Sequence, residues 1–295
     1  MPELAPATRA VWLCRGGCEN RYRFRLFLAV TVCLVVATML AWTVFVMWWQ
    51  SDATGARSAV HSVTEARRIV DARTAPYSAL GRVMGNMVCT AEIVLHPRIV
   101  LTAAHCIGTR RTVVFQLGYQ AGTDLGRFAA TVWAIGARQD IAGQSVHDAS
   151  NDWAILLLER APIGVQPFLL SELPVDRLRQ MGGQLLMPSY SVDMAEGQSL
   201  SLDPACSVRK HAWNVLDCQT SFSGSGAPLL IRNEKEYAVV GVHTGSILER
   251  DEALNSMRLV GHEATGAWAF NEAVRALSAR LEKGRGLSSR PLLAH

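Results

Sequence analysis

The feature that most constrains this chain is an uninterrupted run without charged side chains, from Leu26 to Ser51. A helix of about 20 apolar residues crosses the hydrocarbon core of a bilayer, and this run is long enough. A buried helix of a soluble protein would show a polar stripe, and a signal peptide would have a shorter apolar core of about 7 to 15 residues. The run therefore predicts one transmembrane helix at 26–49.

The charges beside this helix predict its orientation. Five arginines and two glutamates precede residue 26, and the cytoplasmic flanks of membrane helices collect Lys and Arg. The arm 1–25 is therefore expected in the cytoplasm, and everything after residue 50 in the periplasm or outside the cell, where disulfides persist. Most of the net charge of +4 lies in this arm. The rest of the chain is nearly neutral, so we expect no nucleic-acid partner.

The remaining chain predicts a stalk, one β-rich domain and a tail. Residues 50–70 are polar and weakly patterned, as in a stalk. Short apolar runs separated by Gly, Pro and Asn fill 71–284 and are typical of an all-β barrel or sandwich. Within this range, 271–283 predicts a closing amphipathic helix, and 285–295 form the tail. The apolar residues at helical spacing in that helix are Ala273, Val274, Leu277 and Leu281.

The seven cysteines divide by side of the predicted membrane. Cys14, Cys18 and Cys33 are expected to be reduced. The first two could be half of a zinc site or sites of acylation, but two ligands make a weak motif and free thiols are favoured. Four cysteines remain outside, which permits three pairings. Proximity in the sequence favours Cys89 with Cys106 and Cys206 with Cys218.

Three short segments carry the residue types that acyl transfer needs, namely LTAAHC at 101–106, NDWAILLL at 151–158 and SFSGSGAP at 221–228. This chemistry requires a hydroxyl nucleophile, a base and a carboxylate that fixes the tautomer of the base. Ser225, His105 and Asp152 supply these groups. Taken singly, each has a structural alternative: a flexible Gly-Ser loop, a core histidine and a turn cap.

Taken together, the segments resemble the trypsin-like family of serine proteases. The order His, Asp, Ser is that of chymotrypsin-type enzymes, and CTAEIVLHPRIVLTAAHC and CQTSFSGSGAPLL are similar to the family's histidine and nucleophile segments. YAVVGVHTG is similar to its substrate-binding strand, and VDARTAPYSALGRV is similar to secreted bacterial members that include glutamyl endopeptidases. The resemblance spans roughly 70–275 and implies two antiparallel β-barrels, a C-terminal helix and a Cys89–Cys106 disulfide. We expect no cofactor and no metal.

The resemblance also implies a role for each residue. His105 would deprotonate Ser225 and later protonate the leaving amine, while Asp152 would orient His105. The backbone N–H groups of Ser223 and Ser225 would hold the oxyanion. The expected partner is a protein or peptide substrate, cleaved by a membrane-anchored serine endopeptidase. The alternatives are a catalytically inactive binding module tethered to the membrane, and an esterase that uses the same residues.

Two residues depart from the family pattern. The family usually has Gly at the position of Ser223, and a positive φ there would strain a serine by about 1 to 3 kcal/mol. Trypsins have Asp at the position of Gly224, where it binds the new N-terminus formed by zymogen cleavage. That activation is not expected here, although RRIV at 67–70 is similar to a cleavage site.

The residues expected to line the specificity pocket favour an acidic side chain. Gln219 occupies the place of the trypsin Asp, so cleavage after Lys or Arg is disfavoured. Thr220 and His243 fall where glutamyl endopeptidases contact an acidic side chain, and both can donate hydrogen bonds to a carboxylate. The hypothesis is cleavage after Glu, or less often after Asp. The alternative is a pocket for small or apolar side chains, with His243 packed within its strand.

Overall fold

The computed structural model describes residues 38–40, 42, 67–136, 151–181, 183–209, 215–233, 236–251 and 255–288. Two compact units divide the chain, Met1–Ala59 and Val60–His295. In the first unit, 38–40 and 42 are helical. Over the described residues, no helix combines the length and apolar character needed to cross a membrane. The predicted span 26–49 lies mostly outside these residues and stays a prediction, as do the states of Cys14, Cys18 and Cys33.

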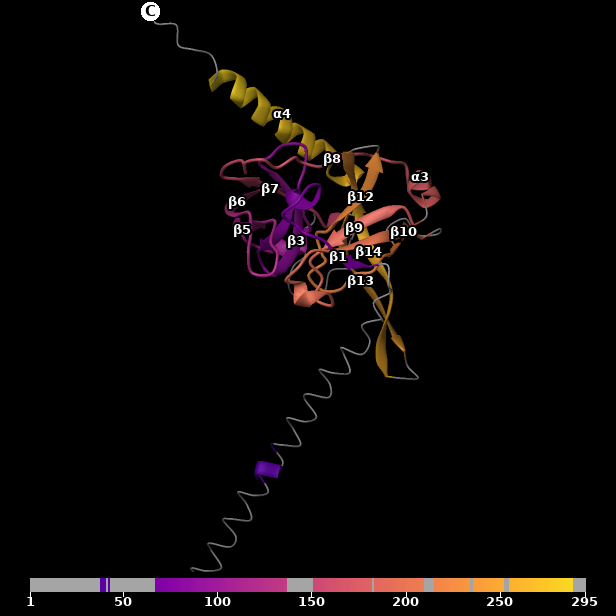
Figure 1. The fold of residues 1–295 in the computed structure, drawn as a ribbon. Helices are drawn as coiled ribbons and strands as arrows, with labels where there is room; N and C mark the ends of the chain where they lie inside the picture. Colours follow the sequence, from indigo (N-terminus) through magenta and orange to yellow (C-terminus); the bar gives the residue numbers. More distant parts are fainter. Residues whose placement is uncertain are drawn as a thin grey trace, which may run out of the picture. The chain divides into compact units, whose positions relative to one another are not determined.

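Six antiparallel strands close the first barrel in the order β2-β3-β4-β7-β6-β5 (Figure 1). They are β2 (Leu80–Met84), β3 (Val88–Ile93), β4 (Ile99–Thr102), β5 (Thr112–Leu117), β6 (Gly126–Ile135) and β7 (Ala154–Leu158). Strand β5 begins with alternating exposed and buried residues, and its buried Phe115 fills the core. This is the period of two that places successive side chains on opposite faces. In β4 every residue is buried.

The second barrel closes through the pairings β9-β10-β11-β14-β13-β12, with β12 also paired to β9. Strand β1 adds to β10, and β8 pairs with β13 in parallel. The strands are β1 (Arg68–Ile69), β8 (Leu169–Leu170), β9 (Leu185–Ser189), β10 (Ser201–Val208), β11 (Val215–Asp217), β12 (Pro228–Asn233), β13 (Glu236–Asp251) and β14 (Ser256–Gly266). The predicted two-barrel, all-β architecture is thus confirmed.

Helices are short except at the end of the domain. They are α2 (Ala104–Ile107), α3 (Val175–Gln180), α4 (Asn271–Ser288) and the 3-10 turns η1 (Tyr77–Ala79), η3 (Ala195–Gly197) and η4 (Ala267–Ala269). Helix α4 confirms the predicted amphipathic helix, because Val274 and Leu277 are buried and Ala273 and Leu281 pack against the same core. It ends at Ser288 rather than at 283.

One boundary differs from the expectation. The stalk was expected to extend to residue 70, but β1 pairs with β10 through Arg68↔Leu202 and Ile69↔Ser201. Arg67 is buried. These residues therefore belong to the second barrel, because strand pairing and burial fix them there.

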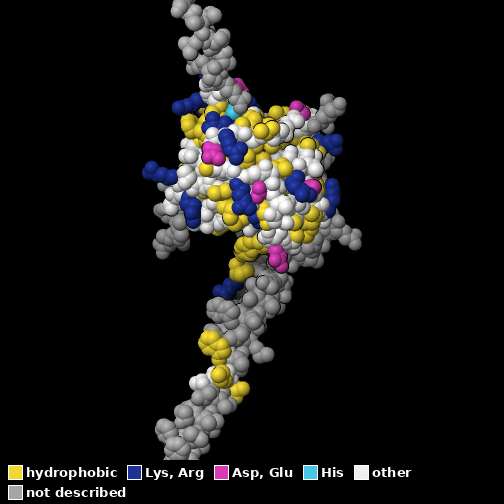
Figure 2. Space-filling view, turned by 60° about the vertical axis from the view of Figure 1, so that its left-hand side comes forward, with side chains coloured by type: hydrophobic (Ala, Val, Ile, Leu, Met, Phe, Trp, Pro, Cys, Tyr) yellow, Lys and Arg dark blue, Asp and Glu magenta, His cyan; other side chains and the backbone are white. Residues whose placement is uncertain are grey.

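The two barrels share a hydrophobic core. Buried Phe115 and Ile155 of the first barrel belong to the same cluster as Leu230, Val239 and α4 residues, while a smaller cluster fills the second barrel. Figure 2 shows one face of the domain, on which Lys and Arg side chains are dispersed among apolar and uncharged ones. The site described next lies where the barrels meet.

Candidate active site at the junction of the barrels

The pairing of β4 with β7 brings His105 and Asp152 together. Thr102 ends β4 opposite Ala154, which begins β7. His105 lies three residues beyond Thr102, on α2, and Asp152 lies two residues before Ala154. In an antiparallel pair, the end of one strand meets the beginning of the other. Residues 47 positions apart are therefore adjacent at the same edge of the first barrel.

Two hydrogen bonds fix the imidazole of His105. Its Nδ1 lies 2.6 Å from Asp152 Oδ2, and its backbone N–H donates to Asp152 Oδ1 at 2.9 Å. Asp152 is buried and His105 is partly exposed. A carboxylate can only accept, so this contact places the ring proton on Nδ1 and leaves Nε2 as the acceptor. The geometry is that of a base whose tautomer is set by a buried carboxylate.

Ser225 lies on the turn between Cys218 and β12, against the first barrel. Its carbonyl oxygen accepts a hydrogen bond from the Thr90 N–H at 2.9 Å. The next residue, Gly226, has φ 79°, and a Cβ there would overlap Thr102 Oγ1 and the Thr90 carbonyl oxygen. A glycine is required by both the positive φ and this close approach. The turn 219–227, named the nucleophile turn for the predicted role of Ser225, is thereby held beside Thr102, three residues before His105.

The structure does not join Ser225 to His105 by a hydrogen bond within the described residues. His105 Nε2 instead lies 3.7 Å from Cys106 Sγ. In ligand-free enzymes this kind of contact is often long and tightens only when substrate binds. Of the three predicted residues, the structure pairs two and places the third on the turn that packs beside them.

The turn before Ser225 leaves two N–H groups available. Ser223 has φ 67°, so the predicted positive φ is present at a residue other than glycine. Within the described part of the chain, neither the Ser223 N–H nor the Ser225 N–H donates to a protein acceptor. The Phe222 carbonyl oxygen accepts from the Val192 N–H at 3.0 Å, so it is engaged by the second barrel. Two unengaged donors two residues apart are the arrangement an oxyanion site needs.

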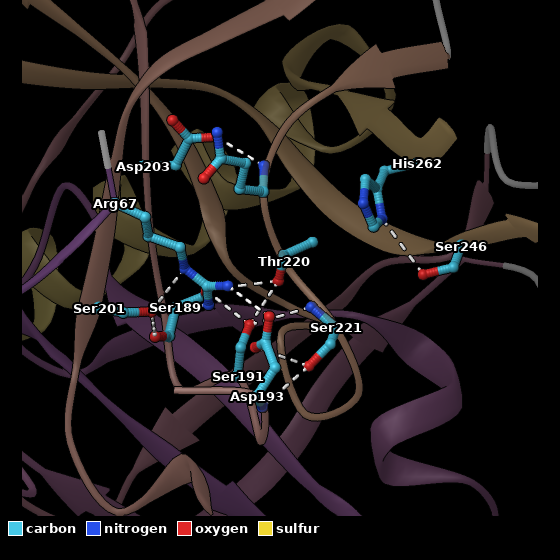
Figure 3. A network of polar contacts seen from close by, with 11 residues as sticks. Arg67, Ser189, Ser191, Asp193, Ser201, Asp203, Thr220, Ser221, Ser246 and His262 are labelled. Atoms are coloured by element: carbon cyan, nitrogen blue, oxygen red, sulfur yellow. Dashed lines mark hydrogen bonds and ion pairs between the residues drawn. The ribbon is translucent and has the colours of Figure 1, made fainter. Parts of the chain in front are cut away.

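Among the predicted pocket residues, Gln219 and Thr220 lie in a buried polar network, part of which Figure 3 shows. The Gln219 N–H donates to Asp203 Oδ2 at 2.6 Å. Thr220 Oγ1 lies 2.6 Å from Ser191 Oγ and 3.4 Å from Ser189 Oγ. Because Asp203 also accepts the Ala205 N–H, its carboxylate is already bonded to backbone groups.

His243 lies on β13 directly behind the nucleophile turn. Its carbonyl oxygen accepts the Gly226 N–H, and its own N–H donates to the Ala227 carbonyl oxygen, both at 2.8 Å. Its Nε2 lies 3.3 Å from Nδ1 of His262, whose Nδ1 is also 3.2 Å from Ser246 Oγ. Burial, followed by the neighbouring His262, lowers the pKa of His243 to about 3. Burial also lowers the pKa of His262 to about 4, so both rings are neutral at neutral pH.

Both expected disulfides are present, Cys89–Cys106 and Cys206–Cys218. The first connects β3 to α2 beside His105. Cys89, Cys106 and His105 place possible metal-ligand atoms within 4.8 Å of one another. The two sulfurs are bonded to each other, which leaves the imidazole as a single ligand, too few to hold a metal ion.

Several polar residues around this site have no role predicted from the sequence. Thr90 contacts the nucleophile turn, and Arg67 pairs with Asp193 in the network of Figure 3. Glu92, on β3, is fully buried, and burial raises its pKa well above the ordinary value. Thr90 and Glu92 lie in the segment that resembles the family's histidine segment, but the resemblance implies no role for them, and Arg67 and Asp193 are 126 residues apart. The sequence signal nearest to this ion pair is Arg67 in RRIV, a segment that is similar to a cleavage site.

Comparisons with known proteins support the fold. No protein-family model matches the sequence, and no curated protein matches it. A solved structure of a Glu endopeptidase in complex with MPD is similar, with a TM-score of 0.51 and 22% identity, covering 72% of this chain and 97% of that chain. The fold is that of trypsin-like serine proteases.

Another similar structure is the protease Anisep from Arthrobacter nicotinovorans. Its TM-score is 0.49 at 15% identity, covering 70% of this chain and 98% of that chain. The likeness to the Glu endopeptidase structure, at 22% identity, shows the fold alone, so the activity has to be argued from the site itself.

Proposed function

We propose that the chain is a serine endopeptidase that hydrolyses peptide bonds through an acyl-enzyme on Ser225. The observation that carries this proposal is the His105–Asp152 contact of 2.6 Å beside the nucleophile turn. A buried carboxylate that fixes the tautomer of a partly exposed imidazole is the pairing that activates a serine hydroxyl. The proposal is supported by the position of this pair beside the turn that carries Ser225, at the junction of the two barrels.

In the proposed reaction, Ser225 Oγ attacks the substrate carbonyl carbon while its proton passes to His105 Nε2. The carbonyl oxygen becomes an oxyanion, which the N–H groups of Ser223 and Ser225 stabilise. Collapse of this intermediate breaks the C–N bond, and His105 gives its proton to the leaving amine. Water then attacks the acyl-enzyme by the same route, with His105 again taking and returning the proton. Asp152 keeps Nδ1 protonated throughout, so Nε2 is the atom that exchanges protons.

Two observations favour the alternative of a catalytically inactive binding module. Ser225 has no hydrogen bond to His105 within the described residues, and Ser223 holds a strained φ of 67°. The two functions differ in whether Ser225 reacts. A fluorophosphonate probe forms a covalent bond only with an activated serine, so we expect the full-length protein to be labelled and the Ser225→Ala protein not to be. Equal absence of labelling in both would favour the binding module.

An esterase that uses the same residues would also be labelled. A panel of matched peptide and ester substrates separates the two activities. We expect hydrolysis of internal peptide bonds, and turnover confined to esters would contradict the endopeptidase.

We further propose that the enzyme prefers an acidic residue before the scissile bond. Thr220 and His243 support this, because a hydroxyl and a neutral imidazole can donate to a carboxylate. The nearby carboxylates are engaged: Asp203 by backbone N–H groups and Asp193 by Arg67. A basic substrate side chain would therefore find no free anion there. The alternative, a pocket for small or apolar side chains, is favoured by the full burial of His243.

For localisation, we propose a single-pass membrane protein with residues 1–25 in the cytoplasm and the protease domain on the opposite side. The uncharged run 26–49 and the arginines before it support this arrangement. A membrane-impermeant thiol reagent applied to intact cells tests the orientation. We expect Cys14 and Cys18 to react only after the membrane is opened, and their labelling in intact cells would contradict it.

A further inference from the structure

Arg67 is an unusual residue for the start of a domain, because its cationic side chain is buried. The residue is 6% exposed. Its Nη1 lies 2.7 Å from Asp193 Oδ2, and its Nε and Nη2 donate to Ser201 Oγ at 3.2 and 2.8 Å. A buried guanidinium is stable only when it is paired and its donors are used. Both conditions are met here.

The second oxygen of Asp193 bonds to the segment that carries the nucleophile. Ser221 Oγ donates to Asp193 Oδ1 at 2.8 Å, and the Asp193 N–H donates back to Ser221 Oγ at 3.2 Å. Figure 3 shows Asp193 between the guanidinium of Arg67 and the hydroxyl of Ser221. The carboxylate thus connects the beginning of the domain to a residue four positions before Ser225.

The backbone of Ser221 makes two hydrogen bonds that fix the conformation of the nucleophile turn. Its carbonyl oxygen accepts the Gly224 N–H at 3.0 Å, and its N–H donates to Ser191 Oγ at 3.2 Å. The next carbonyl, of Phe222, is held by Val192, the neighbour of Asp193. The direction of this carbonyl decides the direction of the Ser223 N–H, because the two belong to one planar peptide unit.

A second path from Arg67 reaches the same segment through hydroxyl groups. Ser201 Oγ, which accepts from Arg67, donates to the Ser189 carbonyl oxygen at 2.9 Å. The hydroxyls of Ser189 and Ser191 are 3.0 Å apart, and Ser191 contacts Thr220. Arg67 is therefore linked to the segment before Ser225 by two paths, one that reaches Ser221 through Asp193 and one that reaches Thr220 through buried serines.

We propose that Arg67 is a positioning residue that, through Asp193 and Ser221, holds the nucleophile turn in the form that presents the Ser223 and Ser225 N–H groups. The cation that orders the turn is then the Arg67 side chain, and not a new N-terminus formed by cleavage of the chain. The segment RRIV is part of the working domain, and activity does not require cleavage within it. This inference rests on the proposed function.

The test uses the full-length protein and compares Arg67→Ala with Arg68→Ala. Arg68 is the matched control, because it is the adjacent arginine on β1 and is exposed. We measure kcat and KM on a peptide substrate, and the rate at which a fluorophosphonate labels Ser225. We expect Arg67→Ala to lower kcat and the labelling rate by about 10- to 100-fold with little change in KM, which approaches the effect of removing an oxyanion donor. Arg68→Ala should stay within about twofold.

Chemical rescue separates positioning from general stability. Free guanidinium ion at millimolar concentration can occupy the space left by Arg67→Ala, and we expect it to restore labelling of that variant only. If Arg67→Ala does not fold, Ser221→Ala removes the link to the turn and keeps the ion pair. We then expect a loss of kcat of about tenfold together with a lower thermal midpoint, because Asp193 Oδ1 and the Asp193 N–H lose their partner.

Three outcomes would overturn the inference. The first is a folded Arg67→Ala protein that is labelled at the wild-type rate. The second is a folded Arg67→Ala protein whose labelling rate is lowered but is not restored by guanidinium ion. The third is full activity of Ser221→Ala. Absence of labelling in the wild-type protein would instead refute the proposed function, and this inference with it. If the wild-type protein is labelled and Arg67→Ala is labelled at the same rate, this inference alone is refuted.

Discussion

The side-chain hydroxyl of Thr90 donates a hydrogen bond to the carbonyl oxygen of Ser223, with 3.1 Å between the two oxygens. The backbone N–H of the same threonine donates to the Ser225 carbonyl oxygen at 2.9 Å. Strand β3 of the first barrel therefore holds the nucleophile turn of the second barrel at two points. Because Cys89 bonds to Cys106, this strand is also tied to the helix that carries His105.

The first prediction concerns this hydroxyl. Thr90→Val keeps the shape of the side chain but leaves the Ser223 carbonyl oxygen and the Tyr190 N–H, which donates to Thr90 Oγ1 at 3.0 Å, without their partner. A buried polar group left unsatisfied costs about 1 to 3 kcal/mol. We expect lower stability in urea and a fall in kcat. Thr90→Ser, which keeps the hydroxyl, is the control. Equal kcat for the valine and wild-type proteins would show that the contact has no role in the turn.

The second prediction concerns the strain at Ser223. A left-handed backbone costs a residue with a Cβ about 1 to 2 kcal/mol, whereas glycine adds about 0.5 to 1 kcal/mol of backbone entropy to the unfolded chain. Ser223→Gly should therefore stabilise the protein by between about 0 and 1.5 kcal/mol. If the strain partly opens the turn at rest, kcat should also rise. A lower kcat for the glycine protein would mean that the serine side chain itself contributes to the site.

The third prediction concerns the proposed triad. Ser225→Ala, His105→Ala and Asp152→Asn should each lower kcat by about 10^4-fold or more, because the three groups act as one unit. The double variant His105→Ala with Ser225→Ala should lose little more than either alone. Steady-state kinetics at matched protein concentration measure this. Substantial turnover by Ser225→Ala would exclude this serine as the nucleophile.

The fourth prediction concerns substrate preference. With its pKa lowered to about 3, His243 is a neutral donor over the whole neutral range. We expect His243→Gln to lower kcat/KM for substrates with Glu before the scissile bond more than for matched substrates with Ala. The ratio of the two values is independent of the fraction of folded enzyme. A peptide-library digest provides the measurement, and a preference for Lys or Arg, or an unchanged ratio, would reject the acidic pocket.

The fifth prediction concerns Glu92 and stability. Burial raises the pKa of this carboxyl well above 4.5, so it is neutral in the folded protein and ionises on unfolding. Above about pH 4.5 unfolding then releases a proton, and stability falls as the pH rises toward the folded pKa, by about 1.4 kcal/mol per pH unit.

Replacing the Glu92 carboxyl should remove this fall of stability with pH. We expect Glu92→Met to be more stable than wild type in urea titrations, by a margin that grows as the pH rises above about 4.5. Glu236→Gln, which changes an exposed carboxyl, is the control and should leave the wild-type slope. A margin independent of pH would mean that Glu92 is ionised in the folded state.

The sequence by itself determined the elements with local signatures. Short apolar runs between turn residues indicated β-strands, the spacing of Val274 and Leu277 indicated α4, and two cysteine pairs close in the sequence indicated both disulfides. The local contexts of His105, Asp152 and Ser225 predicted the three residues of the proposed site. Each of these signals lies within a few residues of the feature it predicts.

Only the tertiary structure decided the contacts between distant segments. The ion pair of Arg67 with Asp193 and the hydrogen bond of Thr90 with Ser223 join residues 126 and 133 positions apart. Neither pair has a composition or spacing that marks it, because any buried arginine needs an anion and any buried hydroxyl needs an acceptor. Which partner each one finds depends on how the two barrels close and pack. For the same reason β1 appeared as stalk in the sequence, since two residues become a strand only when β10 offers its edge.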